Sequence, residues 1–153
     1  MIRRTNAGDL LLPFAAVAVI GYLLLRLTYS SLPPFQWFIA LPIAALAIAE
    51  VVIARRVRAA VRHRPGAKPM TAFAIARGVA LGKSSSLVGA AVAGGAAALA
   101  VKVLPDANRT NAADRDLRVA VAVFIVSLAL VASGLLLERA GIDPGHRNRR
   151  DTT

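Results

Sequence analysis

The sequence has no cysteine, few aromatic residues and few acids. Without cysteine, neither a disulfide framework nor a thiolate-bound metal can form. Aromatic residues make up 5% of the chain, and the arginines are not spread over a face with aromatics between them, as a stacking surface for nucleic acid would need. Lys and Arg number 19 against 8 Asp and Glu, which gives a net charge of +11. Because the basic residues stand at the ends of apolar runs, the charge indicates membrane orientation rather than nucleic-acid binding.

The sequence also lacks the short patterns that mark common catalytic sites. No H-E-x-x-H, C-x-x-C or G-x-x-x-x-G-K-[ST] occurs. Gly82-Lys83-Ser84 copies the end of the last pattern, but Arg77 stands where its leading glycine would be. His63 and His146 lie in arginine-rich segments, which favours a solvated histidine over a catalytic one. We therefore expect no enzyme, no cofactor and no metal.

Long apolar runs dominate what remains. Hydrophobic residues make up 57% of the chain and mean hydropathy is +0.61, whereas soluble domains average roughly 45–50% apolar residues. The runs are too long and too uniformly apolar for a soluble helical bundle. The sequence predicts an all-α fold, one integral membrane four-helix bundle with spans at about 9–29, 34–54, 83–104 and 117–137.

The distribution of charge predicts the topology. The segment 55–69 is rich in arginine and has no acid, so the positive-inside rule makes it a cytoplasmic loop. The segment 105–116 has nearly balanced charges and suits the outer side, and the tail 143–153 is expected to be flexible. Both termini are then cytoplasmic, in a multi-pass protein of the plasma (inner) membrane. Anionic lipid contacts are expected for Arg55, Arg56, Arg58, Arg62, Arg64 and Lys68.

The third span carries a stripe of small residues that suits close helix packing. At about 100° per residue its small residues follow one side while the bulky ones follow the other. In the fourth span, small residues recur every seven positions. Such faces let helix backbones approach each other in a bilayer, which predicts a central third helix. The predicted packing residues are Gly82, Ser86, Ala90, Gly94, Ala97, Ser127 and Gly134.

Three charged residues are predicted to lie at one depth, near the cytoplasmic ends of the spans: Glu50, Lys83 and Glu138. An isolated charge in lipid costs about 2.5–3.5 kcal/mol even on the insertion scale, so such groups tend to face the bundle and pair. One hypothesis is a proton- or ion-responsive cluster that includes Arg77 and the serines 84–86. The alternative is a structural ion pair, or side chains that reach the headgroups.

Several segments together resemble a known family. They are Leu32-Pro33-Pro34 with Trp37, the stretch 80–90 (ALGKSSSLVGA) and the stretch 134–139 (GLLLER). The chain resembles an actinobacterial family of small four-span membrane proteins of unknown function, often encoded beside folate-pathway genes. The resemblance covers nearly the whole chain. It implies the four-span fold but no activity and no functional residues.

Two functions remain open at this stage. The short loops and small-residue faces favour an accessory or scaffolding subunit of a larger membrane assembly, whose partner is another membrane protein. The alternative is a small proton-coupled transporter or channel that acts as a homo-oligomer, with Glu50 as the coupling acid. A hydrated cavity that reaches Glu50 would favour transport over the accessory role.

Overall fold

A computed structural model of the chain describes residues 5–29, 36–62, 70–107 and 109–141. All regular elements in these ranges are helical, and four of the helices are long and apolar enough to cross a membrane. The predicted all-α, four-helix fold is therefore confirmed. The elements are α1 (Ala7–Thr28), η2 (Trp37–Ile39), α2 (Ala40–Val61), α3 (Ala72–Val103), η3 (Leu104–Asp106) and α4 (Asn111–Ala140).

Local caps explain where three of the helices begin. The hydroxyls of Thr71 and Thr110 accept hydrogen bonds from the amides three residues later, each at 3.3 Å. The Asp9 carboxylate accepts the Asn6 amide at 3.0 Å. These contacts satisfy amides that a helix leaves without intrahelical partners. The chain therefore starts α1, α3 and α4 at fixed points.

The helices reach beyond the predicted spans. α2 continues through residues 55–61, where we predicted a loop, because Ala and Arg favour helix and no Pro or Gly intervenes. α3 has 32 residues and is about 48 Å long, against about 30 Å of hydrocarbon in a bilayer. α4 includes 111–116 of the predicted outer loop. Residues 30–35 and 63–69, with Arg64 and Lys68, and the tail 143–153 lie outside the described residues.

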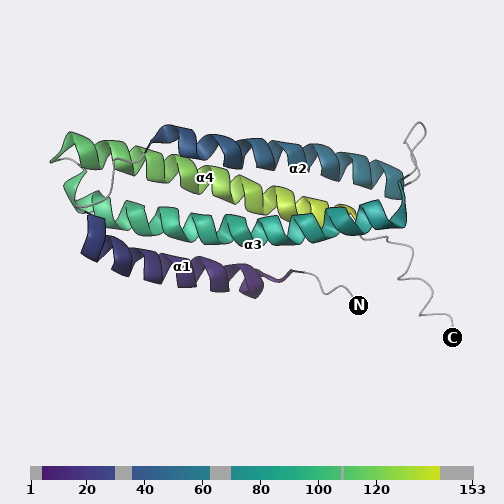
Figure 1. The fold of residues 1–153 in the computed structure, drawn as a ribbon, viewed down its shortest axis with the longest axis horizontal. Helices are drawn as coiled ribbons and strands as arrows, with labels where there is room; N and C mark the ends of the chain where they lie inside the picture. The colour runs from purple at the N-terminus through teal and green to yellow at the C-terminus, as the bar shows by residue number, and fades with distance from the viewer. Residues whose placement is uncertain (1–4, 30–35, 63–69, 108, 142–153) are drawn as a thin grey trace.

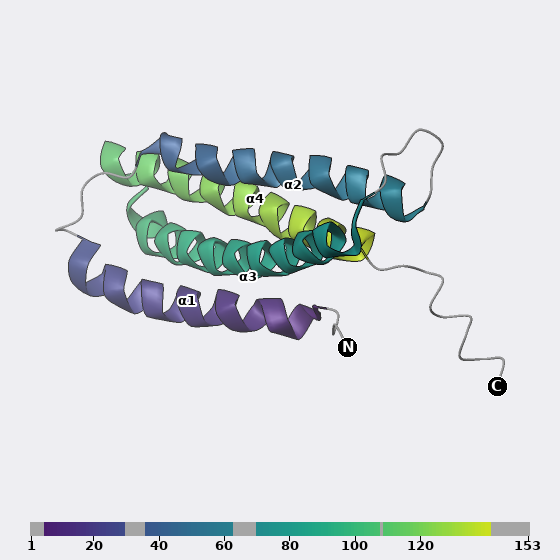
Figure 2. The same ribbon diagram turned by 45° about the vertical axis from the view of Figure 1, so that its right-hand side comes forward.

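The four long helices lie side by side in the order α2, α4, α3, α1 (Figures 1 and 2). Between helices, α1 packs on α3, α3 packs on α4, and α2 packs mainly on α4. α1 and α2 follow each other in the chain but stand at opposite sides of this row. We call the end where α1 finishes and α4 begins the Tyr29 end, and the opposite end the Glu138 end.

Buried apolar clusters that mix alanine with Val or Leu lie at the Glu138 end and at the Tyr29 end of the bundle. Ala54, Val57, Leu137 and Ala140 form one buried cluster at the Glu138 end. Leu99, Val103, Ala113 and Ala120 form another at the Tyr29 end. Much of the stretch of α3 between the clusters consists of buried small residues, so the helix backbones come closest there.

Candidate functional site

The contact between α3 and α4 is built around two glycines. A Cβ on Gly82 would lie 2.5 Å from the Gly134 carbonyl oxygen, and a Cβ on Gly134 would lie 2.5 Å from the Gly82 carbonyl oxygen. Ser86 is fully buried beside Gly134. The two backbones therefore touch directly, which permits Cα–H···O contacts between them.

The same seam continues toward the Tyr29 end through Gly89, which the sequence analysis did not single out. A Cβ there would lie 3.1 Å from the carbonyl oxygen of Ser127. Ser127 is fully buried and Ala90 is buried as well. Gly89 follows Gly82 by seven residues, the same spacing that marked the fourth span, so this spacing could have identified it.

The remaining small residues of the stripe face α1 instead of α4. A Cβ on Gly94 would clash with the carbonyl oxygen of Phe14, and a Cβ on Gly21 would lie 3.5 Å from the Ala98 Cβ. Ala97 lines a groove between α1 and α3. The stripe of small residues on α3 therefore packs against two helices. Its first half, from Gly82 to Ala90, contacts α4, and its second half, from Gly94 to Ala97, contacts α1.

Glu50 lies fully buried between α2 and α4. The Ser133 hydroxyl lies 2.8 Å from Glu50 Oε2 and 2.9 Å from the Leu130 carbonyl oxygen, although a hydroxyl has one proton to donate. Glu50 Oε1 is buried and has no hydrogen-bond partner among the described residues. The buried Glu50 carboxyl therefore has a partner at one of its two oxygens.

Glu138 makes a different contact. Its Oε1 accepts the Thr5 amide at 2.8 Å, just before α1 begins, while its buried Oε2 has no hydrogen-bond partner among the described residues. Ser133 and Glu138 are five residues apart on α4, about 140° around the helix. Glu50 and Glu138 thus bond on different sides of α4, and a joint cluster with Lys83 stays a prediction.

Arg77 and the three serines of the predicted cluster make local contacts within α3. The Arg77 guanidinium lies 4.2 Å from the centre of the Phe73 ring, one turn earlier on α3. Lys83 is partly buried beside Gly82. The hydroxyls of Ser84 and Ser85 donate to the Leu81 carbonyl, and that of Ser86 donates to the Lys83 carbonyl. These serines bond within their own helix, so their hydroxyl protons are not directed toward a polar route.

The basic residues at the end of α2 lie on its surface. Arg55, Arg56, Arg58 and Arg62 are all exposed. They follow Ala54, where the predicted second span ends, so they can reach lipid headgroups. Contact with anionic lipid stays a prediction for this set.

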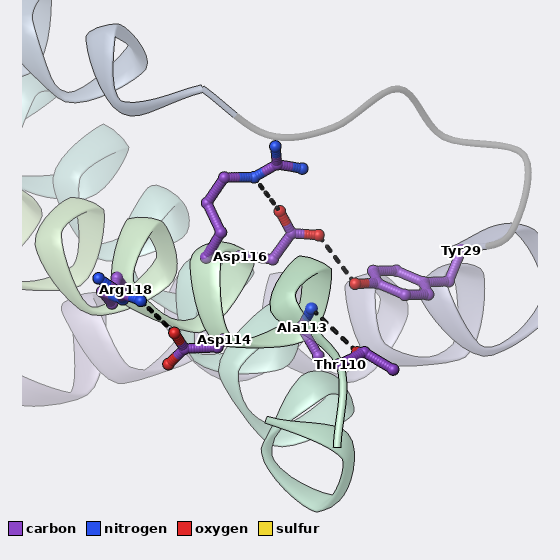
Figure 3. Close-up of polar contacts among 7 residues, drawn as sticks. Tyr29, Thr110, Ala113, Asp114, Asp116 and Arg118 are labelled. Carbon is purple, nitrogen blue, oxygen red and sulfur yellow. Dashed lines mark hydrogen bonds and ion pairs between the residues drawn. The ribbon is translucent and has the colours of Figure 1, made fainter. Parts of the chain in front are cut away.

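A polar cluster at the Tyr29 end joins α1 to α4 (Figure 3). The Tyr29 hydroxyl donates to Asp116 Oδ2 at 2.8 Å, and the Nε of Arg115 lies 3.7 Å from Asp116 Oδ1. Burial, together with this hydrogen bond and the carboxylate charge, raises the pKa of Tyr29 to about 12, so its hydroxyl keeps its proton. Both flanks of α1 therefore bond to acids of α4, Thr5 to Glu138 and Tyr29 to Asp116.

Sequence reasoning did not anticipate Asp116. Its neighbours Asp114 and Arg118 form an exposed ion pair, also drawn in Figure 3, and the Asp106–Arg109 ion pair is exposed too. Nothing in the pattern of charges separates the buried acid from the exposed ones. A useful signal was the tyrosine at the end of the first apolar run, since a buried hydroxyl needs a partner.

Two apolar grooves flank α1. The larger, which we call the α1–α4 groove, has a volume of about 610 Å³ and is lined by residues of α1, α3 and α4 together with Ile39 of η2. The smaller, of about 300 Å³, lies between α1 and α3. Neither groove includes Glu50. Among the described residues, no group of three or more His, Cys, Asp or Glu could hold a metal ion.

Comparison with known proteins identifies a family and adds no activity. No curated protein and no solved structure matches the chain significantly. A family profile matches residues 10–144, which is most of the sequence. The chain belongs to the family described as protein of unknown function (DUF3180).

Proposed function

We propose that this chain is a non-enzymatic accessory subunit of a larger assembly in the plasma (inner) membrane, joined to it through the outer face of α2. The observation that carries the proposal is the order of the helices. α2 stands at one side of the row and is packed mainly on α4. Its other face has no helix of this chain against it among the described residues.

That outer face of α2 is suited to another helix. The buried residues Ala47, Glu50 and Ala54 follow the side that packs on α4. Ala45 and Ala49 lie on the opposite side, four residues apart, and both are exposed. Small residues at this spacing allow a second transmembrane helix to approach closely, as they do at many helix interfaces in bilayers.

The exposed face of α1, at the other side of the row, has no such pair. Its exposed alanines, Ala15 and Ala16, each stand four residues from exposed larger side chains, which are Leu11, Leu12, Val19 and Ile20. Bulky aliphatic groups of this kind suit contact with lipid tails and do not favour close backbone approach. We therefore place the partner on α2.

The transport alternative depends on Glu50 as a coupling acid. It requires water to reach a side chain that is fully buried, and neither groove includes that side chain. No observation on the described residues favours it over the accessory role.

Site-directed photo-crosslinking in native membranes tests the proposal. Because the chain has no cysteine, one introduced cysteine can carry the crosslinker without any background change. We expect a probe at Ala49→Cys to join one larger membrane protein. A probe at Ile20→Cys, on the lipid-facing side of α1, is the matched control and should capture no protein. Capture of only a second copy of this chain, or of no protein at Ala49, would contradict the accessory role.

A substitution series then tests the surface itself. The double variant Ala45→Leu with Ala49→Leu adds bulk where close approach is proposed. It should lower co-purification of the captured partner at least tenfold without changing the melting temperature of the isolated chain. Ile48→Leu, on the same helix and also exposed, keeps the side-chain volume and should leave co-purification unchanged. Equal recovery with all variants would contradict a role for this face.

A further inference from the structure

The α1–α4 groove has the properties of a lipid-chain site, and it lies apart from the outer face of α2 used above. Its floor consists of small residues, Gly21 of α1 and Ala91, Gly95 and Ala96 of α3, whose short side chains leave the space unfilled. Thr28 is the polar side chain among the lining residues, and its hydroxyl already donates to the Leu24 carbonyl at 2.8 Å. The lining therefore offers an occupant no free hydrogen bond and selects an apolar one.

The length of the groove matches one leaflet. Its α1 wall runs from Val17 to Thr28, about 17 Å of helix, and half of the hydrocarbon core is about 15 Å thick. A transmembrane helix needs the whole thickness and a diameter of about 10 Å. A single acyl chain needs one leaflet and a narrow furrow. The length and volume of the groove therefore favour an acyl chain over a helix.

The groove opens toward the bilayer. Val17, Leu24 and Ile39 on its wall and rim are all exposed, so an acyl chain can enter sideways from the surrounding lipid. Its volume of about 610 Å³ lies within the range of roughly 300–1,000 Å³ that is usual for ligand sites.

The charges at the Tyr29 end indicate the headgroup. The acids Asp106, Asp114 and Asp116 each face one arginine. Lys102 is different, because its ammonium lies 5.4 Å from the centre of the Tyr29 ring and has no carboxylate partner among the described residues. It stands one helical turn beyond Leu99, the last α3 residue that lines the groove. A surplus positive charge thus lies at the mouth, at the depth where a phosphate would be.

We propose that the α1–α4 groove binds one anionic glycerophospholipid of the leaflet at the Tyr29 end, with an acyl chain along Gly21 and Gly95 and its phosphate at Lys102. The apolar furrow supplies affinity for the chain. Lys102 supplies preference for an anionic headgroup, through a charge-assisted contact that neutral or zwitterionic lipid satisfies less well. The lipid then fills space between α1 and α4 that this chain leaves open.

Lipid retention by the full-length chain tests the proposal. The purified, delipidated protein is incubated with equal amounts of phosphatidylglycerol and phosphatidylcholine of the same acyl chains, and bound lipid is measured by native mass spectrometry. We expect one phosphatidylglycerol per chain, retained at least tenfold over phosphatidylcholine. Lys102→Gln should abolish the preference. Arg118→Gln, which removes an arginine already paired with Asp114, should keep it.

Filling the groove should remove both lipids. Gly95→Leu places a side chain in the groove where a Cβ would lie 3.7 Å from Val17, an ordinary contact, so we expect the variant to fold. Ala80→Leu adds bulk to an exposed position of the same helix and should retain lipid. If Gly95→Leu does not fold, lipid retention is measured on Ala91→Leu, which fills the same groove.

Several outcomes would overturn the proposal. Equal retention of the two lipids by the natural chain would remove the headgroup preference. Unchanged retention in both groove-filling variants would place the lipid elsewhere. Capture of a protein helix by a crosslinker at Gly95→Cys would show that a protein, and not a lipid, occupies the groove. None of these outcomes depends on the α2 face, so they are separate from failure of the accessory role.

Discussion

α3 packs on α4 and on α1, and the two interfaces differ in how closely the helix backbones approach. Toward α4, small residues stand on both sides, and Gly82 and Gly134 bring the two backbones into reciprocal contact. Toward α1, the closest approach is made by Gly94 against the Phe14 carbonyl, and grooves open on both sides of it. Glycines in reciprocal backbone contact give a continuous seam between α3 and α4, whereas α1 and α3 meet along a narrower contact with a groove on each side.

The largest expected effect comes from breaking the seam. In Gly82→Ala or Gly134→Ala the new methyl group would lie 2.5 Å from a backbone oxygen, so α3 and α4 must separate. We expect the free energy of unfolding to fall by about 3 kcal/mol, the upper end for overpacking. Unfolding in mixed detergent micelles measures it. Gly95→Ala, with its Cβ 3.7 Å from Val17, is the control and should change little.

A smaller effect is expected where α1 meets α3. In Gly94→Ala the methyl group would meet the Phe14 carbonyl, but α1 is held on one side and can shift. We expect a loss of about 2 kcal/mol. Labelling of a cysteine at Ala98→Cys, under α1, should speed up in this variant. Labelling of a cysteine at Ser127→Cys, in the α3–α4 seam, should not. Equal acceleration at both positions would contradict the separation of the two interfaces.

The α2–α4 interface extends the comparison to a polar contact. Ser133→Ala leaves the buried Glu50 carboxyl without its hydrogen-bond partner. The expected loss is about 1.5 kcal/mol, since an orphaned buried polar group keeps its desolvation cost. The matched control is Ser84→Ala, whose hydroxyl is exposed and bonds only to Leu81 of its own helix. If the two variants lose the same stability, the Glu50 contact contributes nothing specific.

The smallest effect concerns the end of α1. Tyr29→Phe removes the hydrogen bond to Asp116 and should cost about 1 kcal/mol near neutral pH. The raised pKa of Tyr29, about 12 against an ordinary 10.0, adds a pH test. The unfolded tyrosine loses its proton first, so stability falls as pH rises from about 10 to about 12. The difference between the natural chain and Tyr29→Phe should shrink over that window, and a constant difference would contradict the assignment.

Much of the fold follows from the sequence for a simple reason. Four long apolar runs can satisfy their backbone groups in lipid only as helices, so the number and type of elements are fixed by local sequence. The recurrence of small residues likewise predicts which positions pack closely. Gly82 and Gly134 satisfied that pattern and lie in backbone contact.

The order of the helices does not follow from local sequence. Both α1 and α4 can accept the stripe on α3, and the stripe alone does not say where it changes partner. The change occurs between Gly89 and Gly94, a shift of five residues that turns the packing face by about 140°. Likewise Asp116 is buried because Tyr29 comes from another helix, and no property of residues near 116 reports this.

The order of the row also governs how the chain assembles during synthesis. α1 leaves the ribosome first, but its packing partner α3 is made third, and both acids that hold its flanks belong to α4, which is made last. α2 likewise packs mainly on α4. α1 can therefore pack on α3 as soon as α3 is made, whereas its two flanking bonds and most of the packing of α2 require α4. Truncation before α4 would leave three inserted helices that cannot complete their native packing.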